Sequence, residues 1–363
     1  MGREFLRIAV FSYGLPRIGQ KRGGIEKVMH DLADGLAHRG NKVTVWTYDP
    51  KPERAAYEVR KLPCQKFVTS WLGQRLTMGY LGNFIAIWPG YSESDVILTI
   101  GDSLLMPLLR KPVIRVMAGS ALGEALSAKS PLRFLHQMGV YIQEILSATL
   151  QRNCIAISHN TRRYNPFIKM VIPLGSNLNA FSHGDSSKSR EPSVLFVGAL
   201  GGRKRGQLLV EWFTKYVRPR HPNATLSVVG EQGHPVQGVS YHVGIGDAEL
   251  IAMYRRAWVY ATPSTYEGFG LPYVEAMASG TPVIATPNVG SREVLADGRF
   301  GMLVEDKRFG ECLAELISDR GKREEMTAKG LERAKEYSLS TMIHRYEELI
   351  YSICQDQQGE AGG

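Results

Sequence analysis

The chain has 363 residues, of which 44% are hydrophobic and 22% are charged, and its formal net charge at pH 7 is +9. This length favours two domains over one, and the composition is ordinary for a soluble globular protein. The sequence contains no run of about 20 apolar residues, so no membrane-spanning helix is expected. The four cysteines are far apart, which indicates neither a disulfide framework nor a metal site and favours a cytoplasmic location.

The positive charge is concentrated in the first half of the chain. Residues 1–180 contain 23 Lys and Arg against 12 Asp and Glu, a net charge of +11, whereas residues 181–363 have a net charge of −2. Such a basic half either is a solvated surface or meets an acidic partner. An anionic membrane, a phosphorylated acceptor and nucleic acid are the candidate partners.

Apolar strands alternate with helices along the first half. The helix expected over 23–40 has apolar residues at helical spacing and ends at Gly40. The expected strands cover 7–13, 41–48, 95–100, 112–118, 154–158 and 170–175. Strands that are apolar on both faces and separated by helices predict a doubly wound parallel sheet.

The alternation restarts after a polar segment that ends in proline. Residues 184–192 are the predicted linker between an N-terminal domain, residues 1–183, and a C-terminal domain, residues 193–339. Both domains are predicted to be Rossmann-like. The amphipathic helix expected over 340–356 packs as a last core helix and is a candidate to cross back to the first domain.

The segment STYEGFGLPYVEAMASGTPVIA, residues 264–285, places two carboxylates around a glycine-containing loop. Gly268 and Gly270 let main-chain N–H groups approach a ligand, and Pro272 suits the first turn of the following helix. The start of that helix favours an anion such as a diphosphate. Glu267 and Glu275 would repel a diphosphate, so they are expected to accept hydroxyl groups on either side of it.

These features fit a nucleotide-diphosphate sugar. A simpler interpretation also remains open from the spacing alone. In it, Glu275 complements the helix dipole and Glu267 is an ordinary loop residue.

The segment 263–304 resembles the signature of the retaining glycosyltransferases of family 4, whose fold is GT-B. The central element is two glutamates separated by seven residues around Gly-Phe-Gly-Leu. The segments 23–45 and 194–206 resemble the first glycine loop and helix of the N-terminal domain and the first strand and loop of the C-terminal domain. The resemblance is weakest over 50–150. It implies two tandem Rossmann-like domains with a cleft between them.

The resemblance also implies roles for single residues. Glu275 would hold the ribose of the nucleotide, and Glu267 a hydroxyl group of the transferred sugar. The main chain of the loop would bind the diphosphate, with Arg205 and Lys204 supplying positive charge. The implied donor-binding set is Gly23, Gly24, Lys204, Arg205, Gly268, Phe269, Gly270, Leu271 and Glu275, with Glu267 and Arg205 catalytic.

The sequence departs from the family pattern at two positions. Ala199 stands where the family usually has the first of two basic residues, and Arg203 or Lys204 would replace that residue from the same loop. Ala118 or Met117 stands where the family commonly has a histidine near the donor sugar. The first departure affects the geometry of the charges around the diphosphate, and the second affects the acceptor pocket.

The mechanism implied is transfer with retention of anomeric configuration. The leaving diphosphate would be stabilised by fixed charges and dipoles, not by covalent catalysis. No Asp-x-Asp motif occurs in the sequence, so neither a metal nor another cofactor is expected. The two domains are expected to close by hinge motion about residues 182–192.

The acceptor is less defined by the sequence. Residues 66–91 combine aromatic, aliphatic and basic side chains, which suits either an anionic membrane surface or a core or lid. With the basic first half, this segment favours a lipid-linked or phosphorylated acceptor and peripheral contact with the cytoplasmic face of a membrane. Glu124 is the candidate acceptor contact.

Two other functions remain open at this stage. One is a different GT-B enzyme, such as an epimerase. The other is a non-catalytic protein that binds nucleotide sugars, which the two departures would allow. Specific nucleic-acid binding is not expected, because no recognised motif occurs.

Overall fold

The computed structural model describes residues 5–16, 24–63, 89–100, 104–105, 108, 111–128, 130–182 and 188–361. These residues form two compact units. The first contains the described residues up to Leu174 together with Leu339–Ala361, and the second contains those of Gly175–Ser338. The chain therefore divides after Leu174, whereas the sequence predicts a first domain of residues 1–183.

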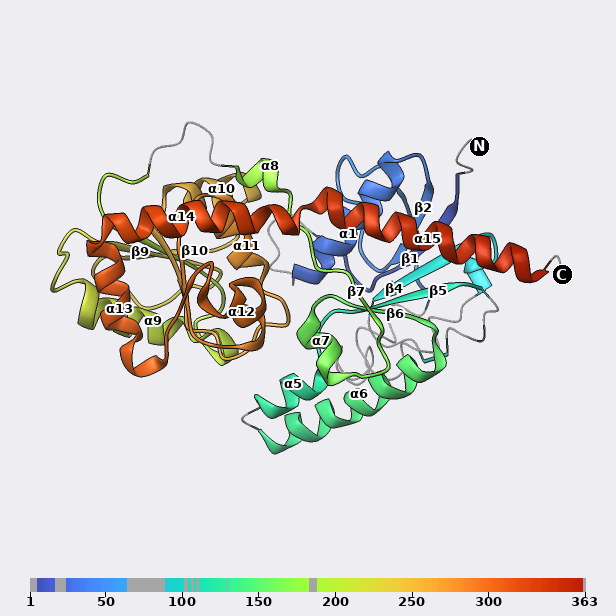
Figure 1. The fold of residues 1–363 in the computed structure, drawn as a ribbon, viewed down its shortest axis with the longest axis horizontal. Coiled ribbons are helices and arrows are strands. Elements are labelled where there is room, and N and C mark those ends of the chain that lie inside the picture. The colour runs from blue at the N-terminus through green and yellow to red at the C-terminus, as the bar shows by residue number, and fades with distance from the viewer. Residues whose placement is uncertain are drawn as a thin grey trace. The chain divides into compact units, whose positions relative to one another are not determined.

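The first unit is built on a parallel sheet (Figure 1). Its described strands are β1 Arg7–Phe11, β2 Lys42–Thr47, β3 Glu58–Lys61, β4 Val96–Ile100, β5 Val113–Met117, β6 Asn153–Ala156 and β7 Met170–Val171. Their order is β3-β2-β1-β4-β5-β6-β7, and every pair is parallel. The central strands are buried because apolar residues face both sides of the sheet.

Helices cover this sheet, as expected for a doubly wound unit. The described α-helices are α1 Gly24–His38, α5 Ala121–Leu126, α6 Pro131–Leu150, α7 His159–Tyr164 and α15 Leu339–Ala361. α15 packs closely on α1, since a Cβ atom at Gly35 would lie 2.2 Å from the side chain of Ile343. An ion pair of 2.8 Å between Arg39 and the buried Glu347 fixes the same contact. The last helix thus belongs to the first unit.

The second unit repeats this topology. Its described strands are β8 Ser193–Val197, β9 Thr225–Val229, β10 Val239–His242, β11 Val259–Thr262, β12 Val283–Ala285 and β13 Met302–Leu303. The order is β10-β9-β8-β11-β12-β13, again with parallel pairs throughout. In both units the first strand lies inside the sheet, and the strand order reverses beside it. The predicted pair of doubly wound parallel sheets is confirmed.

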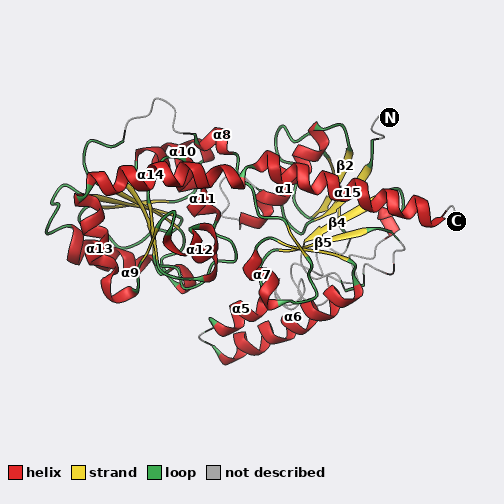
Figure 2. Ribbon diagram, viewed as in Figure 1, coloured by secondary structure: helices red, strands yellow, loops and turns green. Residues whose placement is uncertain are grey.

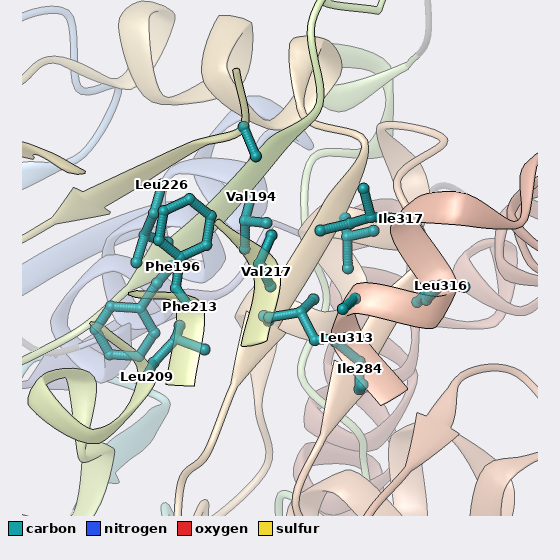
Figure 3. Packing of buried hydrophobic residues seen from close by; sticks show 14 of the residues in the cluster. Val194, Phe196, Leu209, Phe213, Val217, Leu226, Ile284, Leu313, Leu316 and Ile317 are labelled. Atoms are coloured by element: carbon teal, nitrogen blue, oxygen red, sulfur yellow. The ribbon is translucent and has the colours of Figure 1, made fainter. Parts of the chain in front are cut away.

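The helices of the second unit are shown in Figure 2. They are α8 Leu178–Phe181, α9 Gly206–Trp212, α10 Asp247–Arg256, α11 Leu271–Ala278, α12 Val289–Val294, α13 Asp306–Ser318 and α14 Arg320–Ala334. A π-helical turn, Phe213–Val217, extends α9. Side chains from α9, this turn and α13 pack on one face of the sheet (Figure 3), for example Phe213 and Leu313 near Phe196 and Val194.

The described part of the predicted linker is bonded to the second unit. Lys188 donates hydrogen bonds from Nζ to the carbonyl of Ala257 at 2.8 Å and to Oγ1 of Thr281 at 2.6 Å. The main chain of Ser189 bonds to Arg256 and accepts from Trp258 Nε1. Residues 184–187 of this segment lie outside the described residues. None of the described helices is long and apolar enough to span a membrane.

Candidate functional site

The candidate site lies where the strand order of the second sheet reverses. β8 and β11 are neighbours, and both run in the same direction. The loops that follow them, 198–205 and 263–270, therefore leave the same edge of the sheet side by side. This switch point is the usual ligand site of an open parallel sheet. It brings the two segments that the sequence analysis selected into direct contact.

Glycines shape the first of these loops. It ends in a 3-10 turn, Gly202–Lys204, and Arg205 adopts a left-handed conformation with φ of 52°. α9 then starts at Gly206, where a Cβ atom would lie 2.6 Å from the Phe196 ring. Glu231, which follows β9, accepts the N–H of Leu200 at 2.8 Å. The loop is thus held from both ends, with three consecutive basic residues on it.

Glu267 is buried between two of these basic residues. Its carboxylate lies 2.6 Å from Nζ of Lys204 and 2.8 Å from Nη1 of Arg203. Burial raises the pKa of Glu267, but the positive charges of Lys204 and Arg203 outweigh burial and hold the pKa below its ordinary value. The group is therefore a buried carboxylate that stays ionised at neutral pH.

Hydrogen bonds to main-chain carbonyl groups also connect the two loops. Nη1 of Arg203 donates to the carbonyl of Tyr266 at 2.7 Å, and the N–H of Thr265 donates to the carbonyl of Arg203 at 2.9 Å. The two loops therefore form one structural element with a buried anion and two cations at its centre.

The glycine segment after Glu267 leads into α11. Gly270 has φ of 103°, and a Cβ atom there would lie 2.4 Å from the Tyr273 ring, so glycine is required. α11 begins at Leu271 with Pro272 in its first turn, and Gly270 at the N-cap provides no side-chain cap. Phe269 is buried, with its ring 5.4 Å from that of Tyr337. The start of α11 is thus rigid and offers its N-terminal dipole to an anion.

Glu275 lies one turn further along α11. It is half-buried, and its Oε2 accepts a hydrogen bond of 3.0 Å from the hydroxyl group of Tyr254 on α10. Tyr254 is fully buried, and burial, together with the charge of Glu275, raises its pKa well above the ordinary value. The tyrosine therefore remains a hydrogen-bond donor that orients the carboxylate.

Arg205 is engaged with a different acid. Its guanidinium forms a bidentate pair with the carboxylate of Asp306, with N–O distances of 2.6 and 2.8 Å. Nε of Arg205 donates to the carbonyl of Pro263 at 2.6 Å. Asp306 lies in the first turn of α13 and is half-exposed. The arginine is therefore at the same two loops but is turned toward α13.

A third strand end supports the loop. Asn288 caps α12 and donates from Nδ2 to the carbonyl of Ser264 at 3.0 Å, and Thr286 donates to the same carbonyl at 2.7 Å. At Gly290 a Cβ atom would lie 2.5 Å from the carbonyl oxygen of Phe269. α12 therefore packs directly against the main chain of the site loop.

Other predicted residues lie elsewhere. Glu124 is on α5 in the first unit, with Oε2 3.6 Å from the guanidinium of Arg133. Gly24 is the first residue of α1, and Gly23 lies outside the described residues, as do residues 64–88 of the aromatic and basic segment. Ala118 follows β5, and Ala199 is in the loop after β8. Of the predicted set, the structure brings together Lys204, Arg205 and the residues from Glu267 to Glu275.

Three residues of the site were not predicted: Tyr254, Asp306 and Glu231. Tyr254 is the fully buried residue of α10, whose other residues are exposed or half-buried. Asp306 is 101 residues from its partner Arg205, and Glu231 is 31 residues from its partner Leu200. No local sequence pattern therefore predicts these contacts. In the described part of the chain, no group of three or more His, Cys, Asp or Glu is placed to hold a metal ion.

Comparison with known proteins finds a family match over the part of the chain that contains this site. Residues 181–333 match the family described as Glycosyl transferases group 1. Two D-inositol 3-phosphate glycosyltransferases are similar to the chain. The one from Corynebacterium glutamicum is 36% identical over an alignment of 238 residues, and the match covers 57% of this chain and 56% of the relative. The one from Nocardia farcinica is 30% identical over an alignment of 212 residues, and the match covers 50% of this chain and 46% of the relative. The chain thus spans about half the length of these curated relatives.

Solved structures match nearly the whole chain. Sucrose-phosphate synthase from Thermosynechococcus elongatus has a TM-score of 0.76 at 20% identity, over 99% of this chain and 100% of that one. HepE from Anabaena, in complex with UDP and glucose, has a TM-score of 0.72 at 19% identity, over 96% and 100%. WaaG, a glycosyltransferase involved in lipopolysaccharide biosynthesis, has a TM-score of 0.73 at 16% identity, over 94% and 99%. The chain therefore has the GT-B fold, and its residues 181–333 are similar to the Glycosyl transferases group 1 family.

Proposed function

We propose that the protein transfers a sugar from a nucleotide-diphosphate sugar to an acceptor. The observation that carries this proposal is the pair of carboxylates around the start of α11. Glu267 is ionised and buried against Lys204 and Arg203, and Glu275 is oriented by Tyr254. Between them lie a glycine loop and a helix N-terminus. An anion with hydroxyl-bearing groups on both sides matches this arrangement.

Each part of the donor has a proposed partner. The ribose is held by Glu275, and a hydroxyl group of the transferred sugar by Glu267. The diphosphate lies against the main chain of Phe269, Gly270 and Leu271. Lys204, Arg203 and Arg205 are the cations within the same pair of loops. The known complexes of HepE with UDP and with UDP-glucose support a donor of the UDP type for a chain of this fold, with GDP as the other candidate.

The proposed reaction is transfer with retention of configuration, as in family 4. The bond between the anomeric carbon and the diphosphate oxygen breaks, and a bond to the acceptor oxygen forms on the same face of the sugar. The acceptor proton passes to an oxygen of the leaving diphosphate. Fixed charges and main-chain dipoles stabilise that leaving group without a metal ion.

The proposed acceptor carries a phosphate or a lipid-linked phosphate. Two observations support this choice. The curated relatives are named for transfer to D-inositol 3-phosphate, and residues 1–180 have a net charge of +11. A cytoplasmic enzyme that contacts a membrane peripherally would meet both acceptor types.

Calorimetric titration of UDP, GDP, ADP and TDP, with and without EDTA, tests the donor site. We expect one nucleotide to bind without a metal, and Glu275→Ala to weaken its binding at least about tenfold, since a charge-assisted hydrogen bond is lost. Glu249→Ala is the matched control, because Glu249 is an exposed acid on α10. Equal binding by the Glu275→Ala variant would contradict the assigned site.

Turnover is tested separately with the nucleotide sugar that binds. Release of the nucleotide and an acceptor product with the anomeric configuration of the donor, read from NMR coupling constants, are the expected results. Binding without release of nucleotide, in the presence of phosphorylated and lipid-linked acceptors, would instead identify a non-catalytic binding protein.

A further inference from the structure

α6 in the first unit has its polar side inward and its apolar side outward. A surface helix of a globular protein normally buries its apolar stripe. The buried residues of α6 are instead Gln143, Glu144, Ser147 and Ala148. Its exposed residues include Leu132 at 78% exposure, Leu135 at 67%, Ile142 at 58%, Leu146 at 48% and Leu150 at 60%.

The exposed apolar residues follow helical spacing. They recur at intervals of three, four and seven residues, so they form one stripe along the helix. Leu126, at the end of the neighbouring α5, is also 68% exposed. We call Leu126 together with Leu132, Leu135, Ile142, Leu146 and Leu150 the α6 stripe. Figure 1 shows α5 and α6 side by side at the rim of the first unit.

Polar bonds explain why the stripe is not needed for folding. The carboxylate of Glu144 accepts the N–H of Ala121 at 3.0 and 3.2 Å. The carbonyl of Glu144 accepts from the buried Arg115 at 3.3 Å and from Asn165 at 3.2 Å. These bonds attach the inward face of α6 to α5, β5 and the segment after α7. The apolar side chains therefore remain available for another contact.

The charges around the stripe are positive. Residues 111–170 contain eight Lys and Arg and two Asp and Glu. Arg115 and Glu144 are both buried, and Glu124 pairs with Arg133. Arg133 and Arg152 are exposed near the two ends of α6, and Arg162, Arg163 and Lys169 are exposed on the segment that packs against it. Exposed Phe167 and Met170 flank Lys169.

We propose that the α6 stripe docks on the surface of an anionic lipid bilayer. α6 would lie in the plane of the interface, with its leucines among the acyl chains and its flanking arginines at the anionic headgroups. A second copy of the chain fits this surface less well. In an antiparallel pair, Arg133 of one copy would face Arg152 of the other, and like charges would meet at both ends. This proposal does not depend on the proposed sugar transfer.

Vesicle flotation with the full-length chain tests the proposal. We expect binding to phosphatidylcholine mixed with phosphatidylglycerol, and weaker binding to phosphatidylcholine alone. The triple variant Leu135→Gln/Ile142→Gln/Leu146→Gln should lower partitioning by more than about tenfold, because it removes buried apolar groups from the interface. The double variant Arg133→Gln/Arg152→Gln should lower it by about fivefold for each arginine, on mixed vesicles only.

Phe5→Gln/Val243→Gln is the matched control, since both residues are exposed apolar side chains on other segments, at 70% and 58%. It should partition like the wild type. Circular dichroism of the triple variant should be unchanged, which separates loss of docking from loss of folding. Failure of the wild type to float, or equal flotation of the triple variant, would overturn the proposal. So would sedimentation showing that the stripe instead joins two copies and that the triple variant is monomeric.

Discussion

The two units share a strand order, but the buried charge in each has a different role. In the second unit, buried Glu267 lies at the switch point of the sheet and is paired with two cations that are themselves partly exposed. In the first unit, Arg115 is fully buried within β5, and its guanidinium donates to the main chain of α6. One charge is placed at the edge where strands end, and the other in the middle of a strand.

The position of a buried charge along its strand distinguishes a candidate ligand site from a purely structural position. A charge at the strand ends can reach a ligand with little movement, because the neighbouring loops are already held by Gly290, Asn288 and Glu231. A charge inside a sheet can reach only the helices that cover it. A buried charge at the end of a strand is therefore a candidate for ligand binding, whereas an equally buried charge in the middle of a strand contacts only the rest of the fold.

The largest effect is expected from Glu267→Gln. The variant keeps the shape of the side chain but removes the charge that pairs with Lys204. The same charge is the proposed acceptor of a sugar hydroxyl group. Nucleotide release from the donor should fall about a hundredfold or more. Steady-state kinetics with the nucleotide sugar identified by calorimetry measures it. Glu249→Gln on α10 should retain the wild-type rate, and an unchanged rate for Glu267→Gln would remove Glu267 from the site.

Arg115→Met is the counterpart in the first unit. It should lower the free energy of unfolding by about 2 kcal/mol, because a buried hydrogen-bond donor and its packing are lost. Nucleotide affinity should stay at the wild-type value, since the proposed donor site lies in the second unit. Urea unfolding and calorimetry on the same preparation give both quantities. A fall in nucleotide affinity alongside the fall in stability would contradict a purely structural role for Arg115.

Lys188 offers a pH-dependent test of a buried amine, whose Nζ donates to the carbonyl of Ala257 and to the hydroxyl group of Thr281. Burial lowers its pKa to about 7. Between this value and the ordinary pKa of 10.5, the unfolded chain binds more protons than the folded chain. The stability contributed by this group therefore rises with pH across that window.

From pH 7 to pH 9, the unfolding free energy of the wild type should rise by about 1–2 kcal/mol relative to Lys188→Met. Urea unfolding followed by tryptophan fluorescence at both pH values measures the difference. Lys307→Met, at an exposed lysine of α13, is the control and should follow the wild type. Parallel pH profiles for the wild type and Lys188→Met would show that the amine is not desolvated.

Much of this arrangement could be predicted from the sequence. The apolar strands predict the two doubly wound sheets. The glycine positions and the GFGLP segment predict the loop before α11. Both predictions succeed because they depend on local patterns. β3 and β10 were missed, since they are polar edge strands with little burial. The pairing of Glu267 with Lys204 and of Arg205 with Asp306 depends on side chains far apart in the chain, which no local pattern encodes.

The orientation of α6 was missed for a related reason. Its apolar periodicity is that of an ordinary amphipathic helix, and periodicity does not say which side is buried. The answer depends on partners from other elements. The N–H of Ala121 donates to the carboxylate of Glu144, and Arg115 and Asn165 donate to its main-chain carbonyl. Sequence patterns therefore predict where the elements lie. Which helix face is exposed and which charges are paired depends on buried polar partners from distant parts of the chain.

The smallest expected effect concerns Arg205, whose role is the sharpest test of the site. Its bidentate pair with Asp306 is half-exposed on the acid side, so breaking it should cost little.

If Arg205 turns to the diphosphate when the donor binds, Asp306 competes with the donor for the guanidinium. Asp306→Asn should then raise nucleotide affinity by about two- to fivefold, with a stronger dependence on salt than in Arg205→Gln. Calorimetry at two salt concentrations measures both variants. A fall in affinity for Asp306→Asn would mean that the acid positions Arg205 for binding, and unchanged affinity in both variants would leave Lys204 and Arg203 as the cations of the site.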